Sequence, residues 1–223
     1  MKILHLSYSD FKGGASRAVK RIHESLLPKV DSNLIVNLSN EIYGNKNIFG
    51  PKNIFFKYKN LLRAAVGTRL GLLLRSDNFV IHSLGVLPSN FSKFINKSDF
   101  DIINLHWIGG EMISIEDIGK IKKPIVWTLH DMWPFCGAEH FTLDDRWKYG
   151  YFKSNKKKNE KYFDLKRFCW DRKVRSWKKK MNIVGVSDWI SNCASDSSLM
   201  CDWPNRTINN TLDTNFWKPE SKS

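Results

Sequence analysis

The chain has 223 residues, of which 42% are hydrophobic and 26% charged, with a net charge of +14. This composition is typical of a soluble globular protein and excludes an intrinsically disordered chain. No apolar run approaches the roughly 20 residues of a membrane-spanning helix, and the polar segment Ser7–Asp10 argues against a signal peptide, so we expect a cytoplasmic protein.

Strand and helix patterns alternate along the chain. A buried strand is predicted over 2–7, and after a Gly-containing loop comes an amphipathic helix whose apolar stripe is Ala15, Ala18, Val19, Ile22 and Leu26. Further strands are predicted over 33–38, 101–106, 125–129, 182–186 and 207–209. Further helices are predicted over 55–74, 114–121, 162–181 and after an N-cap at Ser187. In the helix over 162–181, the pattern predicts a buried face with Lys and Arg on the outer face. The residues predicted on the buried face are Phe163, Trp170, Val174, Trp177 and Met181.

This alternation predicts an α/β fold: a Rossmann-like, doubly wound, mostly parallel sheet. One domain is expected over 1–214, followed by a tail of linker character over 215–223. Ligands of such sheets bind beyond the carboxyl ends of the strands, so candidate site residues are sought there.

Gly13 and Gly14 follow the first predicted strand and precede a helix. Without Cβ atoms they let a ligand approach the backbone, and free amides at a helix start attract a diphosphate. Arg17, one turn later, is within reach of the same anion. The alternatives are a tight turn into the helix and a solvated arginine, since the pattern matches neither common phosphate-binding motif.

Polar and aromatic residues end two neighbouring strands of the predicted sheet. His130 and Asp131 suggest contact with substrate hydroxyls or proton transfer, and the alternative is a pair that braces the loop. His106 ends its strand in the same way, and Trp107 and Trp133 are candidates for stacking on a sugar. The alternatives are a structural histidine and core tryptophans.

The cysteines and histidines show no metal-ligand spacing, so no metal is expected. Between Lys153 and Lys180 there are 13 Lys or Arg and three acidic residues, a local excess of 13 − 3 = +10. Such a concentration attracts polyanions, and the alternative is a solubilising charged surface.

Four segments carry a family resemblance. MKILHLSYSDFKGGASRAVKRIHESL resembles the opening of bacterial family 4 glycosyltransferases of colanic acid and O-antigen synthesis. DIINLHWIGGEMISIEDIGKIKKPIVWTLHDMWPFCGAEHF resembles their HWxxG and PxVWTLHDMWPFTGGCHY motifs. VGVSDWISNCASDSSL and TINNTLDTNFWKP are similar to the family's SxWL helix and interdomain junction. The matches extend from Met1 to about Pro219.

The resemblance implies the N-terminal, acceptor-side half of a two-domain GT-B enzyme, with a C-terminal donor domain absent after Ser223 or supplied as a separate half. Such an enzyme is a retaining hexosyltransferase of lipopolysaccharide or other surface polysaccharide synthesis, without a cofactor or metal. Its partners are a nucleotide sugar and a lipid-linked or oligosaccharide acceptor. Carried over to this sequence, Gly13, Gly14 and Arg17 bind the donor diphosphate. His130 and Asp131 are catalytic, and His106, Trp107 and Trp133 line the acceptor side.

The chain departs from the family in the segment Cys136–Phe141, where CGAEHF replaces TGGCHY, and at the junction, which lacks a glycine. The lysine-rich segment also replaces a cysteine cluster of relatives. Because acceptors in this family are carried on lipids, we expect peripheral binding at the inner face of the cytoplasmic membrane. The predicted contacts are Lys156, Lys157, Lys158, Lys178, Lys179 and Lys180.

Two other functions compete with glycosyl transfer. One is a non-catalytic basic module that binds an anionic membrane or nucleic acid, although no nucleic-acid motif is present and nucleic acid is not the expected partner. The other is a truncated product without function.

Overall fold

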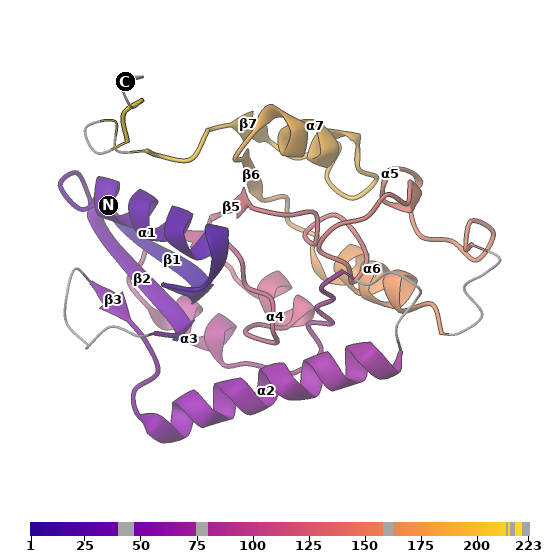
Figure 1. Ribbon diagram of the computed structural model, residues 1–223, viewed down its shortest axis with the longest axis horizontal. Helices are drawn as coiled ribbons and strands as arrows, with labels where there is room; N and C mark the ends of the chain where they lie inside the picture. Colours follow the sequence, from indigo (N-terminus) through magenta and orange to yellow (C-terminus); the bar gives the residue numbers. More distant parts are fainter. Residues whose placement is uncertain (40–46, 75–79, 158–162, 213, 215–216, 220–223) are drawn as a thin grey trace.

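A computed structural model describes residues 1–39, 47–74, 80–157, 163–212, 214 and 217–219. Within these residues the chain forms an α/β fold around one parallel sheet with the strand order β3-β2-β1-β4-β5-β6-β7 (Figure 1). The strands are β1 (Lys2–Ser9), β2 (Asp31–Leu38), β3 (Ile48–Phe49), β4 (Ile102–Leu105), β5 (Ile125–Leu129), β6 (Asn182–Gly185) and β7 (Asn205–Thr207). The helices are α1 (Gly13–Leu26), α2 (Ile54–Leu73), α3 (Phe91–Lys97), α4 (Ile115–Gly119), α5 (Arg146–Tyr149), α6 (Leu165–Ser176) and α7 (Asp188–Asp196).

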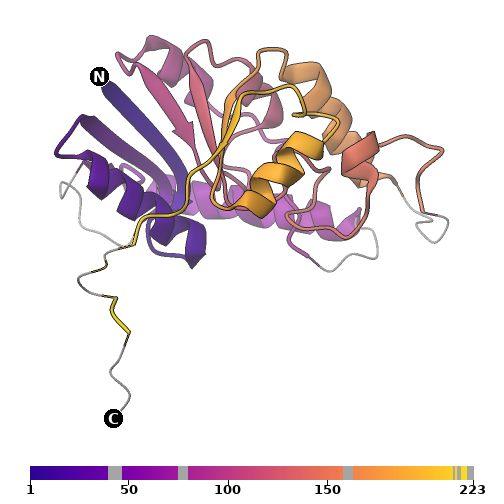
Figure 2. The same ribbon diagram turned by 90° about the horizontal axis from the view of Figure 1, so that it is seen from above.

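This strand order is that of a Rossmann-like, doubly wound sheet, which confirms the predicted fold class. The order reverses between β1 and β4, the neighbouring strands at which the chain crosses from one half of the sheet to the other. Figure 2 shows the strands running side by side in one direction. Ligands of doubly wound sheets bind beyond the carboxyl ends of the strands at such a reversal, so β1, β4 and β5 frame the candidate site.

The two faces of the sheet differ in polarity. On one face, Leu6 of β1 and Leu105 of β4 belong to the main hydrophobic core, which also contains buried residues of α4 and α6. On the other face lies α1, where Val19 packs with three apolar residues of β2 and β3. Because side chains alternate along a strand, His5 points to the α1 side, as does Asn104, its partner in register. A polar sheet face is unusual for a parallel sheet.

Most predicted elements are present, with shifted ends. The strand predicted over 125–129 has exactly those bounds, and Ser187 caps α7 by accepting a hydrogen bond from the amide of Ile190. The helix predicted over 55–74 is α2, one residue earlier. The sequence pattern did not predict β3, α3 or α5.

The prediction for the helix over 162–181 is wrong in length and in placing its cations on the outer face. Helix α6 covers only Leu165–Ser176, and three of its cations, Lys166, Arg172 and Lys173, are buried. Of the predicted buried face, Phe163 is exposed, whereas Trp177 and Met181 are buried. The cations are buried because each finds acceptors in the interior: Lys166 contacts Asp144, and Arg172 donates to Glu116 and to backbone carbonyls.

No helix within the described residues is long and apolar enough to cross a membrane. Of the predicted tail over 215–223, only 217–219 belong to the described part of the chain.

Candidate functional site at the carboxyl edge of the sheet

Three histidines on neighbouring strands form a hydrogen-bonded row. His5 lies within β1, and His106 and His130 directly follow β4 and β5. The Nδ1 atom of His5 lies 3.1 Å from Nε2 of His106, and Nδ1 of His106 lies 3.0 Å from Nε2 of His130. The rings of His106 and His130 are stacked with their centroids 5.3 Å apart. The row runs from the buried His5 to the partly exposed His130.

Burial keeps all three imidazoles neutral at physiological pH. Desolvation lowers the pKa of His130 to about 4, against a smaller opposing effect of Asp131. It lowers the pKa of His5 to about 3, with a contribution from His23, and the pKa of His106 lies well below its usual value. A neutral imidazole has one donor and one acceptor nitrogen, so His130 is suited to hydrogen bonding rather than to ion pairing.

The hydrogen-bond row favours one set of tautomers. The Nε2 atom of His5 is buried without a hydrogen-bond partner among the described residues. An unpaired lone pair there is less costly than an unpaired N–H, so His5 donates from Nδ1 to His106. His106 then donates from Nδ1 to Nε2 of His130. This arrangement leaves the proton of His130 on Nδ1, where the ring can act as a hydrogen-bond donor.

Gly13 and Gly14 begin helix α1, beyond the carboxyl end of β1. Gly13 has a φ of +87°, a left-handed conformation that favours glycine. A Cβ atom at Gly14 would meet no atom within 4 Å, so the surface there is open. The N-cap, Lys12, makes no side-chain capping bond, and the first turn of α1 has no acidic residue. Arg17 is exposed one turn later, and an anion at this helix start would meet free amides.

Asp131 pairs with His140 rather than with His130. Its Oδ2 atom lies 2.6 Å from Nδ1 of His140, and its Oδ1 accepts a hydrogen bond from the amide of Trp133. On the other side of the ring, Nε2 of His140 lies 2.8 Å from Oγ of Ser83. These contacts correspond to the loop-bracing alternative for Asp131, and its catalytic role stays a prediction. The sequence pattern did not indicate Ser83, because it lies about 50 residues from this loop.

The two candidate tryptophans lie in different surroundings. Trp107 is partly exposed, stands edge-to-face to Tyr8, and has its indole nitrogen 3.1 Å from Nδ1 of His140. Trp133 is only 3% exposed, donates to the carbonyl of Ser83, and packs beside Trp177. Trp107 can therefore present a ring to a ligand, whereas Trp133 has the position of a core residue.

Helix α6 holds the loop after β5 in place through hydrogen bonds. The buried ammonium group of Lys173 donates to the carbonyls of Trp133, Cys136 and Gly137, the last at 2.8 Å. Desolvation lowers the pKa of Lys173 to about 8. The hydroxyl of Tyr151 accepts from the amide of Gly137 and donates to Glu139. The sequence pattern did not indicate Lys173, because it lies among many similar cations.

Asp10 is another residue that the sequence pattern did not indicate. It lies between β1 and Gly13 and is 3% exposed. Its Oδ2 atom accepts a hydrogen bond from Ser39, whereas Oδ1 is buried and has no hydrogen-bond partner among the described residues. Asp10 therefore offers an acceptor beside the start of α1.

The predicted membrane-contact lysines lie beyond the two ends of α6. Lys156 is partly exposed and Lys157 exposed, while Lys158 lies outside the described residues. Beyond the other end of α6, Lys178, Lys179 and Lys180 are exposed. Because a helix of 12 residues is about 18 Å long, these are two separate groups.

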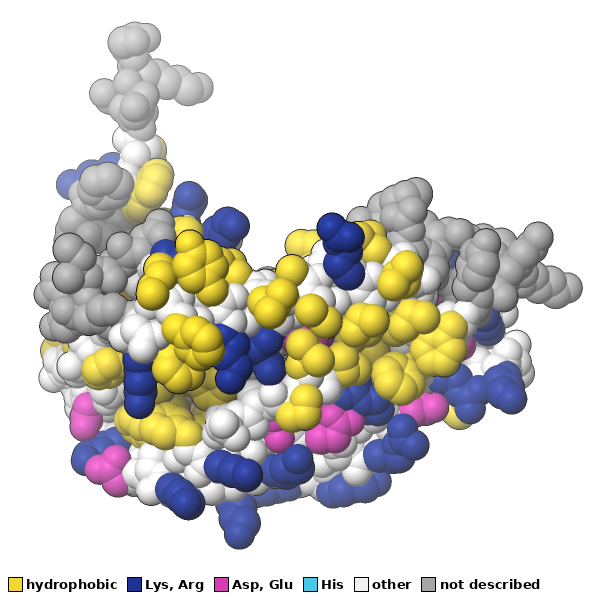
Figure 3. All heavy atoms as spheres, turned by 90° about the horizontal axis from the view of Figure 1, so that it is seen from below, with side chains coloured by type: hydrophobic (Ala, Val, Ile, Leu, Met, Phe, Trp, Pro, Cys, Tyr) yellow, Lys and Arg dark blue, Asp and Glu magenta, His cyan; other side chains and the backbone are white. Residues whose placement is uncertain are grey.

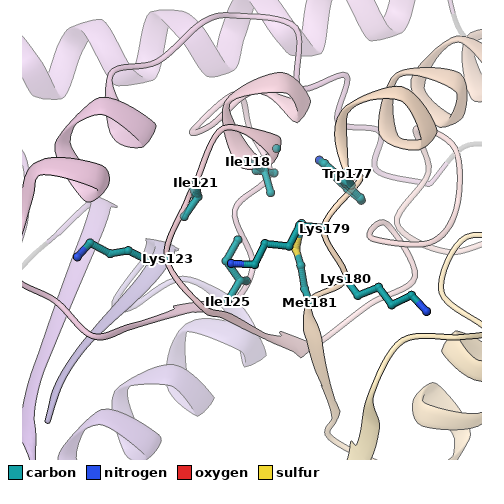
Figure 4. A pocket seen from close by; sticks show the side chains of 9 residues that line it. Ile118, Ile121, Lys123, Ile125, Trp177, Lys179, Lys180 and Met181 are labelled. Atoms are coloured by element: carbon teal, nitrogen blue, oxygen red, sulfur yellow. The ribbon is translucent and has the colours of Figure 1, made fainter.

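Lys179 and Lys180 line a small pocket with Trp177 and Met181 (Figure 4). Ile125, the first residue of β5, also lines this pocket. The pocket therefore lies at the amino edge of the sheet, opposite His130.

The described residues contain no group of three or more His, Cys, Asp or Glu side chains placed to hold a metal ion. A scan against protein-family models, a search of curated proteins and a search of solved structures each found no match to this chain. The family resemblance therefore depends on the sequence motifs alone.

Proposed function

We propose that the chain is the acceptor-side half of a retaining, nucleotide-sugar-dependent glycosyltransferase of surface polysaccharide synthesis. The observation that carries the proposal is the placement of a neutral, partly exposed His130 at the carboxyl edge of a Rossmann-like sheet. This is where such sheets bind their ligands. The open start of α1 follows β1, two strands away from β5 in the same sheet.

In this function each part of the edge has a separate task. The amides at the start of α1, with Arg17, stabilise the negative charge that develops on the departing diphosphate. His130 donates a hydrogen bond from Nδ1 to a hydroxyl of the donor sugar, next to the carbon at which the bond to diphosphate breaks. His106 acts through His130 by fixing its tautomer, and Trp107 stacks on the acceptor sugar.

The proposal includes partners. A donor-binding half of the GT-B architecture, in the same or a separate polypeptide, supplies the remaining contacts to the nucleotide sugar. The acceptor is lipid-linked or an oligosaccharide, and Lys156, Lys157 and Lys178–Lys180 contact the anionic membrane that holds it. No step requires a metal or another cofactor.

An NMR titration of the chain alone with a nucleotide sugar tests this site. Because the donor half contributes most contacts, we expect millimolar binding, on the order of 4 kcal/mol, with shifts confined to the amides near Gly13, Gly14 and His130. Gly14→Val serves as the matched variant, since it fills the open space at the helix start, and it should abolish the shifts.

Two results would contradict the proposal. Shifts confined to the residues around Lys179 would identify a general anion-binding module. Unchanged shifts in Gly14→Val would show that the ligand does not approach the backbone at α1.

A further inference from the structure

Helix α2 differs from an ordinary surface helix because its apolar side faces away from the core. Its buried residues are Gly67 and Gly71, whereas most of its large apolar residues are exposed and only Leu70 packs against the core. Among them, Phe55 is 69% exposed, Leu62 65% and Leu73 81%. A surface helix of a globular protein normally turns its apolar stripe toward the core. In Figure 3, which shows the molecule from the side on which α2 lies in Figure 1, hydrophobic side chains form a band interspersed with Lys and Arg.

The orientation of α2 is fixed by specific contacts. A Cβ atom at Gly67 would lie 2.4 Å from Cγ of Glu111, so only glycine permits this approach. The guanidinium group of Arg63 donates to the carbonyls of Glu111, Leu87 and Pro88. Asn60 donates to the carbonyl of Asn37. These groups occupy one side of the helix, so the apolar side cannot rotate inward without breaking them.

The exposed residues form one continuous face. At 100° per residue, Ile54, Tyr58, Leu62 and Leu73 fall within about 100° of each other on the helix circumference, opposite Gly67 and Gly71. A contiguous face of exposed large apolar residues is typical of an interaction site.

The charges on α2 indicate which kind of partner contacts its apolar face. Helix α2 contains four cations and no acidic residue. Lys59 and Arg69 are exposed, and Arg69 lies in the middle of the apolar face. A second copy of the same helix would bring these cations against each other without acidic partners. An apolar face with exposed aromatic rings and cations fits the interface of an anionic bilayer.

We propose that α2 lies in the surface of an anionic membrane, with the apolar face that contains Phe55, Leu62 and Leu73 embedded among the lipids. This surface is distinct from the two groups of lysines at the ends of α6. The proposal does not depend on the glycosyltransferase function, because it uses neither the site nor the motifs of the sheet edge.

Vesicle co-sedimentation of the full chain tests this proposal. Vesicles of phosphatidylcholine alone are compared with vesicles that contain phosphatidylglycerol. The triple variant Phe55→Gln, Leu62→Gln and Leu73→Gln removes the apolar face, and Lys59→Gln with Arg69→Gln removes its exposed cations. The matched control changes three exposed apolar residues elsewhere, Ile81→Gln, Leu143→Gln and Ile208→Gln. Circular dichroism confirms that each variant is folded.

We expect the wild-type chain to bind phosphatidylglycerol vesicles and the apolar triple variant to bind about tenfold or more weakly, because burial of three large side chains is lost. The cation variant should lose binding mainly at low salt, and the control should bind as the wild type does. Equal binding of the triple variant and the wild type would overturn the proposal. So would a wild-type dimer that the triple variant dissociates, since the occupant would then be a second copy.

Discussion

Three imidazoles in direct contact make the residues of the sheet edge sensitive to acid. His5 and His106 are almost completely buried, and each is hydrogen-bonded to a neighbouring ring. Protonation of two adjacent rings would place like charges about 3 Å apart in the interior, where they interact strongly. The neutral state is therefore required for the hydrogen bonds between the rings, because Nε2 of His106 and of His130 must each accept one.

We predict that stability falls as the pH is lowered from about 6.5 toward 4. The folded-state pKa values of His5 and His130 are about 3 and about 4, below the unfolded value of 6.5, so the unfolded chain binds more protons in this interval. The stabilisation is complete above pH 6.5, and each unit of pKa difference corresponds to about 1.4 kcal/mol at a single site.

Thermal unfolding at pH 7.5 and pH 5 measures this effect. In His5→Gln, which removes a titrating ring and keeps hydrogen-bonding capacity, the decrease between the two pH values should be smaller. A wild-type melting temperature that is equal at both pH values would contradict the assignment.

At the level of elements, the loop after β5 depends on α6. Lys173 is the main link, since its ammonium group contacts three carbonyls of the loop and lies 4.0 Å from the centre of the Trp133 ring. A Cβ atom at Gly137 would lie 2.6 Å from the backbone of Lys166, so the loop also touches the helix directly. Because α6 holds the loop in place, the loop keeps Asp131 and His140 in position.

We predict that Lys173→Met destabilises the protein by about 1–3 kcal/mol, because buried carbonyls lose their donor. For a chain of this size the melting temperature should fall by about 2–4 °C per kcal/mol. Lys157→Met is the matched control, since Lys157 is exposed. If the two variants melt at the same temperature, Lys173 does not support the loop.

The sequence predicted the strands better than it predicted the faces of the helices. Short apolar runs such as Ile125–Leu129 indicate buried strands directly, because both faces of a parallel sheet are covered. The burial of Lys173 and Arg172 could not be predicted, because their acceptors are carbonyls and a carboxylate from distant parts of the chain. Likewise, the sequence placed His106 and His130 at the ends of neighbouring strands, whereas the partnership of Asp131 with His140 depends on the loop conformation.

On the scale of the whole molecule, three surfaces are separated. The histidine row and the start of α1 occupy the carboxyl edge of the sheet, and Lys179 and Lys180 the amino edge. The apolar face of α2 forms a third surface along one side of the molecule (Figures 1 and 3). Membrane binding through α2 would use neither the carboxyl edge nor the lysines of the amino edge. The proposed catalytic and membrane-binding functions can therefore be removed separately.

The measurement that tests the proposed function most directly is glycosyl transfer in the presence of a donor-binding half. The chain is combined with the C-terminal half of a family 4 glycosyltransferase. Calorimetry first confirms that this half binds a nucleotide sugar. Radiolabelled nucleotide sugars and a membrane lipid extract are added, and label in the lipid-soluble product is counted.

We predict transfer only when both halves are present, with a reduction of about 10²–10³ in His130→Ala, because a hydrogen bond to the reacting sugar is lost. The control Leu143→Gln, at a residue that is 88% exposed, should retain full activity. No transfer from any nucleotide sugar with both halves present, or full activity of His130→Ala, would contradict the account.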